Sequence, residues 1–148
     1  MRTVLAAVIF VASIVPAFAD GWRYDSGLSS LVPQGDTLHA ISNGAAVFLC
    51  STHTPVIFGV EISYDIKDIY KKHPPAKVAW IVDDTVGKTA SWRRQGLYVF
   101  ADHQTTEQIA AVARGAKSFI GIRTANLTSL FDVKGLAHGL QQLAKACG

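Results

Sequence analysis

Apolar residues recur every three or four positions in the last stretch of the chain, Phe131 to Gly148. The apolar stripe consists of Leu136, Leu140, Leu143 and Cys147. The polar residues that point away from this stripe are His138, Gln141, Gln142 and Lys145. Such spacing is that of one face of an α-helix, so we expect a C-terminal helix that packs on the domain along the stripe. Cys147 would then lie on the buried face.

Alternation of apolar and polar residues predicts strands through most of the remaining chain. The expected strands cover residues 21–25, 37–42, 45–51, 56–62, 78–82, 88–93, 97–102, 117–124 and 127–133. Asn43-Gly44, between the second and third of these, is a strong signal for a hairpin turn. We expect two further hairpins, turned near Gln95-Gly96 and at Ala125-Asn126. Residues 45–50 are apolar on both faces, which indicates a central strand.

A short helix is expected to interrupt the late strands. Thr105 and Gln108 form the Thr-x-x-Gln pattern of a capping box, and Gly115 is placed to end the helix. The residues expected to face inward are Ile109, Val112 and Ala113. The polar connection from Tyr64 to Pro75 is expected to contain one helical turn, around Asp68 to Lys72.

This order of elements predicts a mostly β protein. We expect an antiparallel β-sandwich or a partly open barrel, with the short inserted helix and a C-terminal helix that covers one open end or face. The chain has 148 residues and shows no internal repeat or interdomain linker. Residues 20–148 are therefore expected to form a single β-rich domain.

The first residues, 1–19, have the three parts of a secretory signal peptide. Arg2 supplies the positive charge, an apolar run follows, and Ala17-Phe18-Ala19 is a small-x-small cleavage site. The apolar run is shorter than the roughly 20 residues of a membrane-spanning helix. We therefore expect cleavage after Ala19, a periplasmic or secreted product, and no stable membrane span after the signal is removed.

Charge narrows the choice of partners. The formal net charge is +3, with acidic and basic residues interspersed. No block of lysine and arginine forms the basic face that nucleic-acid binding requires. We expect no nucleic-acid partner and no cofactor.

Cys50 and Cys147 are the two cysteines of the chain. Both lie in the part expected to be exported, where thiols oxidise, and only one pairing is available. We expect a Cys50–Cys147 disulfide that holds the C-terminal helix to the core. The alternatives are a reactive thiol or a metal ligand, although neither cysteine has a CxxC neighbour.

Motifs for catalysis and metal binding are missing from the sequence. The five histidines, His39, His53, His73, His103 and His138, lack the spacing of metal ligands. No serine lies in a G-x-S-x-G motif. An enzyme would need two acids facing one another, and the candidates are Asp83, Asp84 and Asp102. We expect neither a catalytic residue nor a metal site.

The hairpin expected at residues 92–98 carries residue types that are enriched at binding hot spots. Tryptophan, tyrosine and arginine bury a large area and also donate hydrogen bonds. We expect a contact surface for another protein made of Trp92, Arg93, Arg94 and Tyr98. The alternative is that Trp92 belongs to the core and that the two arginines form an ordinary charged turn.

A further pattern extends along the chain, and most of its residues lie in the last eighteen positions. A strand with a tryptophan opens the domain, a central strand ends in cysteine, and the chain closes with F-x-x-x-G-L-x-x-G-L-x-x-L-x-x-x-C-G. The residues concerned are Trp22, Cys50, Trp80, Phe131, Gly135, Leu136, Leu140, Leu143, Cys147 and Gly148. This layout resembles small exported bacterial proteins of the invasion-associated locus B type. It is also similar to VasI-type accessory proteins of type VI secretion.

The resemblance implies a β-sandwich-like envelope protein with a disulfide, associated with interaction with host cells and without a catalytic residue. We therefore expect a non-enzymatic exported binding or accessory protein that recognises an envelope or host protein. The alternative is an inhibitor of a cell-wall hydrolase, similar to lysozyme inhibitors, or a small periplasmic hydrolase. An inhibitor would present a loop such as Asp102 to Thr106 or Arg93 to Gly96.

Overall fold

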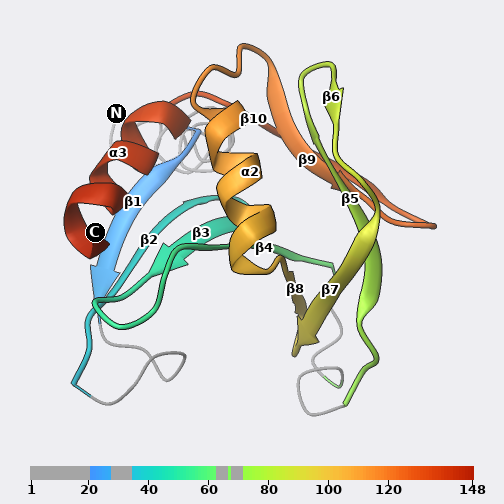
Figure 1. Ribbon diagram of the computed structural model, residues 1–148, viewed down its shortest axis with the longest axis horizontal. Helices are drawn as coiled ribbons and strands as arrows, with labels where there is room; N and C mark the ends of the chain where they lie inside the picture. Colours follow the sequence, from blue (N-terminus) through green and yellow to red (C-terminus); the bar gives the residue numbers. More distant parts are fainter. Residues whose placement is uncertain (1–20, 28–34, 63–66, 68–71) are drawn as a thin grey trace, which may run out of the picture.

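The structure is a computed structural model, which describes residues 21–27, 35–62, 67 and 72–148. The expected signal peptide lies outside these residues, as does the expected helical turn after Tyr64 except for Lys72. In the described part of the chain, ten strands form one sheet in the order β1-β2-β3-β4-β8-β7-β5-β9-β10, with β6 paired to β5 (Figure 1). Every pairing is antiparallel. The prediction of a mostly antiparallel β fold with two helices is confirmed.

The first strands are β1 (Arg23–Gly27), β2 (Leu38–Asn43), β3 (Ala46–Cys50), β4 (Ile57–Glu61) and β5 (Ala76–Val82). The later ones are β6 (Thr85–Val86), β7 (Ala90–Gln95), β8 (Tyr98–Phe100), β9 (Phe119–Arg123) and β10 (Thr128–Asp132). The described helices are α2 (His103–Ala113) and α3 (Leu136–Cys147).

The predicted hairpins form, but two of them turn one residue later than expected. Asn43 pairs with Ala46, so the turn between β2 and β3 is Gly44-Ala45. Gln95 pairs with Tyr98, which makes Gly96-Leu97 the turn between β7 and β8. Gly44 and Gly96 both have a φ of 59°. A tight hairpin turn requires positive φ at its first central residue, where glycine meets no steric penalty, so the turn is set at the glycine.

The two ends of the sheet meet at one corner. The backbone N–H of Trp22, just before β1, donates to the carbonyl of Lys134 at 2.8 Å. The indole Nε1 of Trp22 donates to the carbonyl of Asp132, at the end of β10, also at 2.8 Å. The side-chain amide of Asn43 donates to the same carbonyl at 3.3 Å. The sheet is therefore a partly open barrel that is joined at this corner.

The core lies between the sheet and the two helices, which pack against the same sheet face (Figure 1). We call this face the inner face, and the opposite one the outer face. From the strands, the core includes Ile41, Phe48, Phe58, Val60, Val78, Trp80, Trp92 and Ile122. From the helices it includes Ile109, Leu136, Leu140 and Leu143. The predicted stripe of α3 is confirmed.

Helix α2 begins earlier than its capping-box pattern indicates. The N-cap is Asp102, whose Oδ1 accepts a hydrogen bond from the backbone N–H of Thr105 at 2.7 Å. Thr105 lies inside the first turn, so its predicted role as the cap is wrong. An ionised carboxylate is the stronger acceptor for the unpaired N–H groups of a helix start. Ile109 and Ala113 are buried as expected.

Helix α3 lies close to the sheet because glycine occupies its N-cap and one position inside the helix. Gly135, at its N-terminus, has a φ of 77°. A Cβ at this position would lie 2.9 Å from the carbonyl oxygen of Trp22. A Cβ on Gly139 would lie 2.9 Å from the Cγ2 atom of Ile41. Glycine at both positions therefore allows the close contact of helix and sheet.

The predicted disulfide is confirmed. Cys50 at the end of β3 and Cys147 at the end of α3 are bonded, with a Cα–Cα distance of 6.2 Å. The bond joins positions 97 residues apart, so it links the last turn of the C-terminal helix to a central strand. A disulfide of this kind fits an oxidising compartment.

Removal of the disulfide is expected to lower the free energy of unfolding by about 2–4 kcal/mol, because the bond restricts the unfolded chain. Urea unfolding of a Cys50→Ala, Cys147→Ala variant beside the wild type measures the difference. A reducing agent should reproduce the loss in the wild type and leave the double variant unchanged. Labelling of either cysteine by iodoacetamide in the denatured, unreduced wild type would contradict the assignment.

Candidate functional site

Trp92, the centre of the predicted contact surface, is a core residue. Its side chain is 1% exposed and meets the ring of Phe58 edge-on, with ring centroids 6.0 Å apart. Successive residues of a strand point to opposite faces, and this register sends Trp92 to the inner face. The prediction that Trp92 contacts a partner is therefore wrong, and the alternative of a core residue is correct.

The other three predicted residues divide between the two faces of the hairpin. Arg94 is half-buried and follows Trp92 at the strand period, so it belongs to the inner side. Arg93 is exposed and Tyr98 is half-buried, and both belong to the outer face. Gln95 pairs with Tyr98 and Arg93 pairs with Phe100, so Arg93 and Tyr98 share a face of the hairpin at diagonal positions. The binding role of Arg93, Arg94 and Tyr98 stays a prediction.

A groove of about 480 Å³ lies on the outer face, and we call it the outer groove. Its lining consists of Leu38, Ala40, Val47, Leu49, Tyr98, Phe100 and the turn residues 95–97. Gly59 of β4 lies opposite Phe100 in the sheet, and a Cβ there would lie 2.5 Å from the Phe100 ring. The ring can therefore lie across the backbone of β4. One wall comes from β2 and β3 and the other from β8, so the groove joins segments far apart in sequence.

Aromatic and charged side chains meet at one wall of the outer groove. The rings of Tyr98 and Phe100 stack with centroids 5.6 Å apart. The guanidinium carbon of Arg93 lies 5.3 Å from the centroid of the Phe100 ring, and its Nη1 donates to the side chain of Gln95. A cation held over an aromatic face is attracted by the ring electrons. Arg93 therefore places a positive charge beside an apolar surface.

The hydroxyl of Tyr98 stays protonated at physiological pH. Burial raises the pKa of Tyr98 above its ordinary value of 10.0, and the negative charge of Glu61 raises it further. Both effects disfavour the phenolate. The outer groove therefore contains a neutral hydroxyl that can donate a hydrogen bond.

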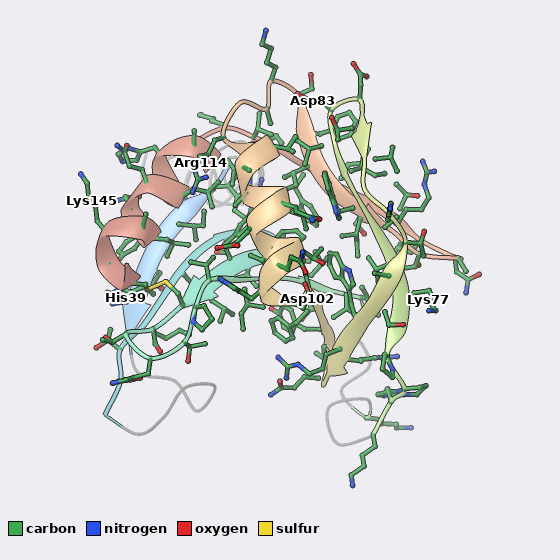
Figure 2. The ribbon with its side chains drawn as sticks, in the orientation of Figure 1. His39, Lys77, Asp83, Asp102, Arg114 and Lys145 are labelled. Carbon is green, nitrogen blue, oxygen red and sulfur yellow. A yellow bond between two sulfur atoms is a disulfide. The ribbon has the colours of Figure 1, made fainter. Side chains whose placement is uncertain are left out.

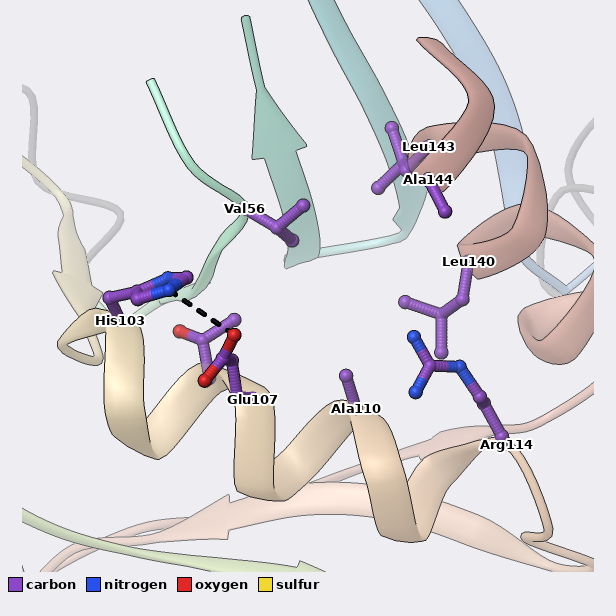
Figure 3. A pocket seen from close by; sticks show the side chains of 9 residues that line it. Val56, His103, Glu107, Ala110, Arg114, Leu140, Leu143 and Ala144 are labelled. Carbon is purple, nitrogen blue, oxygen red and sulfur yellow. Dashed lines mark ion pairs between the residues drawn. The ribbon is translucent and has the colours of Figure 1, made fainter. Parts of the chain in front are cut away.

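A second cleft, of about 360 Å³, lies between α2 and α3, and we call it the interhelical cleft (Figure 3). Its lining consists of Val56, His103, Thr106, Glu107, Ala110, Arg114, Leu140, Leu143 and Ala144. The hydroxyl oxygen of Thr106 accepts a hydrogen bond from the backbone N–H of Phe58 at 3.0 Å, which attaches α2 to β4. His103 Nε2 lies 3.3 Å from Glu107 Oε1 at one end of the cleft.

The carboxylate of Asp83 has a structural role. It accepts hydrogen bonds from three backbone N–H groups, those of Lys117 at 2.8 Å, Ser118 at 2.9 Å and Phe119 at 3.0 Å. The bond from Lys117, followed by that from Phe119, lowers the pKa of Asp83 from its ordinary 3.8. Asp83 therefore ties the segment after α2 to the end of β5.

Asp102 is likewise engaged by backbone groups. The N–H of Thr105, followed by the side chain of the same residue, lowers the pKa of Asp102. Figure 2 shows Asp83 and Asp102 in separate parts of the molecule. Neither the outer groove nor the interhelical cleft is lined by Asp83, Asp84 or Asp102. A general acid needs a raised pKa, so Asp83 and Asp102 have the opposite of the property required.

Two of the described histidines, His39 and His53, have local partners outside the two clefts. His53 Nδ1 lies 2.9 Å from Asp36 Oδ2, and His39 Nδ1 lies 2.6 Å from the hydroxyl of Tyr24. Over residues 21–27, 35–62, 67 and 72–148, no three His, Cys, Asp or Glu side chains gather as metal ligands. Over the same residues, none of the helices has the length and apolar content needed to cross a bilayer.

Sequence reasoning missed most of the outer groove. Val47 and Leu49 were recognised only as part of a strand that is apolar on both faces. The structure covers one face of this strand with core residues and leaves the other face to line the groove. Apolar residues on both faces of a strand were therefore the signal for this surface. No such signal marks the interhelical cleft, because its walls come from two helices.

No protein-family model, curated protein or solved structure matches this chain. The resemblance to the invasion-associated locus B type and to VasI-type proteins rests on the motif residues alone, and it stays a prediction.

The lowered pKa values of Asp83 and Asp102 predict a loss of stability in acid. Because each folded pKa lies below the unfolded one, the contribution is fully present above about pH 5 and is lost as the pH falls through the folded values. An Asp83→Asn, Asp102→Asn variant should be less stable than the wild type at about pH 7, and the difference should shrink toward about pH 3. Urea unfolding across this range measures it.

The matched control is Asp84→Asn, since Asp84 is exposed and accepts none of these hydrogen bonds. It should leave the pH profile of the wild type unchanged. A difference between the double variant and the wild type that stays constant from neutral to acid pH would show that the two carboxylates do not act as described.

Proposed function

We propose that this chain is a non-enzymatic binding protein that recognises a segment of another protein in the outer groove. The observation that carries the proposal is an apolar hollow of about 480 Å³ on the solvent side of the sheet. An antiparallel sheet usually has one apolar face packed on the core and a polar face toward water. An apolar hollow on the second face is typical of a surface that contacts a partner.

The apolar lining of the groove, together with Arg93 beside Phe100 at its wall, supports a partner segment with apolar side chains and one acidic side chain. The apolar side chains would contact Leu38, Val47 and Leu49, and the acidic side chain would pair with Arg93. Arg93 hydrogen-bonds to the neutral Gln95 and so keeps its charge available. Tyrosine and arginine are residue types that contribute strongly to protein–protein contacts.

The position of the groove supports recognition through side chains. The groove crosses β2, β3, β4 and β8, which are consecutive in the sheet and internal to it. Added-strand binding needs an exposed sheet edge, and the strands with a single neighbour here are β1, β6 and β10, none of which the groove crosses. The partner would therefore fill the hollow rather than extend the sheet.

The proposal extends to an exported location and to the family resemblance. A disulfide and the signal-like residues 1–19 support a periplasmic or secreted protein. The disulfide and the helix closing the chain agree with the layout of the invasion-associated locus B type. Asp102 to Thr106, offered as an inhibitory loop in the alternative function, instead forms the N-cap and first turn of α2.

Two substitutions, one in the groove and one beside its aromatic wall, should each weaken capture of a partner by about ten-fold or more. Val47→Asp places a charge on the apolar wall at a half-buried position, and Arg93→Gln removes the cation. The oxidised protein would be immobilised and offered envelope and host-cell extracts, with captured proteins quantified by mass spectrometry. Lys77→Gln is the matched control, since Lys77 is an exposed residue of β5 outside the groove (Figure 2).

All variants would first be compared with the wild type by circular dichroism and thermal unfolding. A protein retained by the wild type and Lys77→Gln, and lost by both folded groove variants, supports the proposal. Equal capture by the wild type and all three variants would contradict the proposal that the outer groove is the contact surface.

A further inference from the structure

We infer a second binding site, in the interhelical cleft, for an aliphatic monocarboxylate whose carboxylate pairs with Arg114. This inference does not depend on the proposed function, because the outer groove and the interhelical cleft share no residue. The two sites also lie on opposite faces of the sheet.

The size and walls of the cleft fit a small aliphatic ligand. Its volume of about 360 Å³ is near the lower end of the range of roughly 300–1,000 Å³ found for small-molecule sites. The apolar side chains that line it are Val56, Ala110, Leu140, Leu143 and Ala144. They come from α2, α3 and the segment before β4, so a ligand stem would be enclosed by three separate parts of the chain (Figure 3).

Arg114 supplies the charge that selects an anion. It follows the last turn of α2, and its guanidinium points toward Leu140 in the cleft (Figure 3). Among the residues that the structure describes, none forms a hydrogen bond or ion pair with this guanidinium. A guanidinium matches a carboxylate in geometry and binds it through two parallel hydrogen bonds. An unpaired guanidinium beside apolar walls therefore favours a ligand with a carboxylate head and an apolar stem.

Glu107 disfavours a second negative charge on the ligand, at the end that lies away from Arg114. It lies about two turns before Arg114 on the same helix, which is a separation of about 10 Å along the axis. Its Oε1 lies 3.3 Å from Nε2 of His103, itself exposed, at the far end of the cleft (Figure 3). A second anionic group on the ligand would approach Glu107 and be repelled. The cleft should therefore prefer a monocarboxylate to a dicarboxylate of the same length.

The test uses octanoate and its dicarboxylate counterpart, suberate, as probes. The oxidised protein, labelled with ¹⁵N, would be titrated with each and followed by amide chemical shifts. Octanoate should produce saturable shifts in α2 and α3, and suberate should bind about ten-fold more weakly. Arg114→Gln should weaken octanoate binding by about ten-fold or more, and Glu107→Gln should narrow the gap between the two probes.

Two further variants separate the site from general effects. Lys145→Gln removes the same charge from an exposed position of α3 outside the cleft, and it should leave octanoate binding unchanged. Ala144→Phe fills the cleft from an exposed position and should abolish saturable binding in a folded protein. Val47→Asp, in the outer groove, should have no effect.

Three results would each overturn the inference. They are shifts that do not saturate, equal octanoate affinity of the wild type and Arg114→Gln, and suberate binding as tight as octanoate binding. The Val47→Asp variant reports on the outer groove alone. A negative octanoate result would therefore overturn the interhelical site and leave the proposed function to be tested by the capture experiment.

Discussion

The structure depends on the attachment of α3 to the inner face of the sheet. The leucine stripe of this helix covers β2 and β3, Gly139 brings its backbone close to Ile41, and Cys147 bonds to Cys50. Without α3, the apolar inner side of these strands would meet water, at a cost of roughly 25 cal/mol for each Å² exposed. The segment that leads into α3 also pairs with the start of β1 through Trp22. One helix therefore covers the core and joins the two ends of the sheet.

This arrangement accounts for both candidate sites. The sheet has two apolar surfaces near β3, and the helices cover only the inner one. The outer one remains open beside Tyr98, Phe100 and Arg93, where aromatic stacking and a cation–π contact organise the wall. On the inner side, α2 is attached to β4 through Thr106 and α3 to β2 through Gly139, which leaves a cleft between the helices. The interhelical cleft therefore results from how the helices are anchored, and the outer groove from the sheet face that they leave uncovered.

Two of the three acidic residues considered for catalysis act at the ends of secondary structure. Asp83 binds three consecutive N–H groups after α2, and Asp102 caps the start of that helix. Backbone N–H groups stabilise the ionised form of a carboxylate, so both pKa values fall. Aspartates that follow strands are therefore ambiguous in a sequence. The same residue type serves chemistry when it is desolvated and serves structure when backbone donors surround it.

Local sequence determined the elements of this fold. The stripe of α3, the alternation in the strands and the glycines at the hairpin turns each depend on neighbouring residues, and two cysteines allow only one bond. Tertiary structure decided which residues share a surface. Trp92 and Tyr98 lie on opposite faces of the hairpin whether it turns at Gln95-Gly96 or at Gly96-Leu97. Packing of the core against one sheet face decided that Trp92 is buried and that Tyr98 lines the outer groove. The walls of the outer groove come from β2, β3 and β8, and Arg114 meets Leu140 only because two helices pack side by side. Contacts between such distant segments follow from packing of the whole chain, which no local pattern contains.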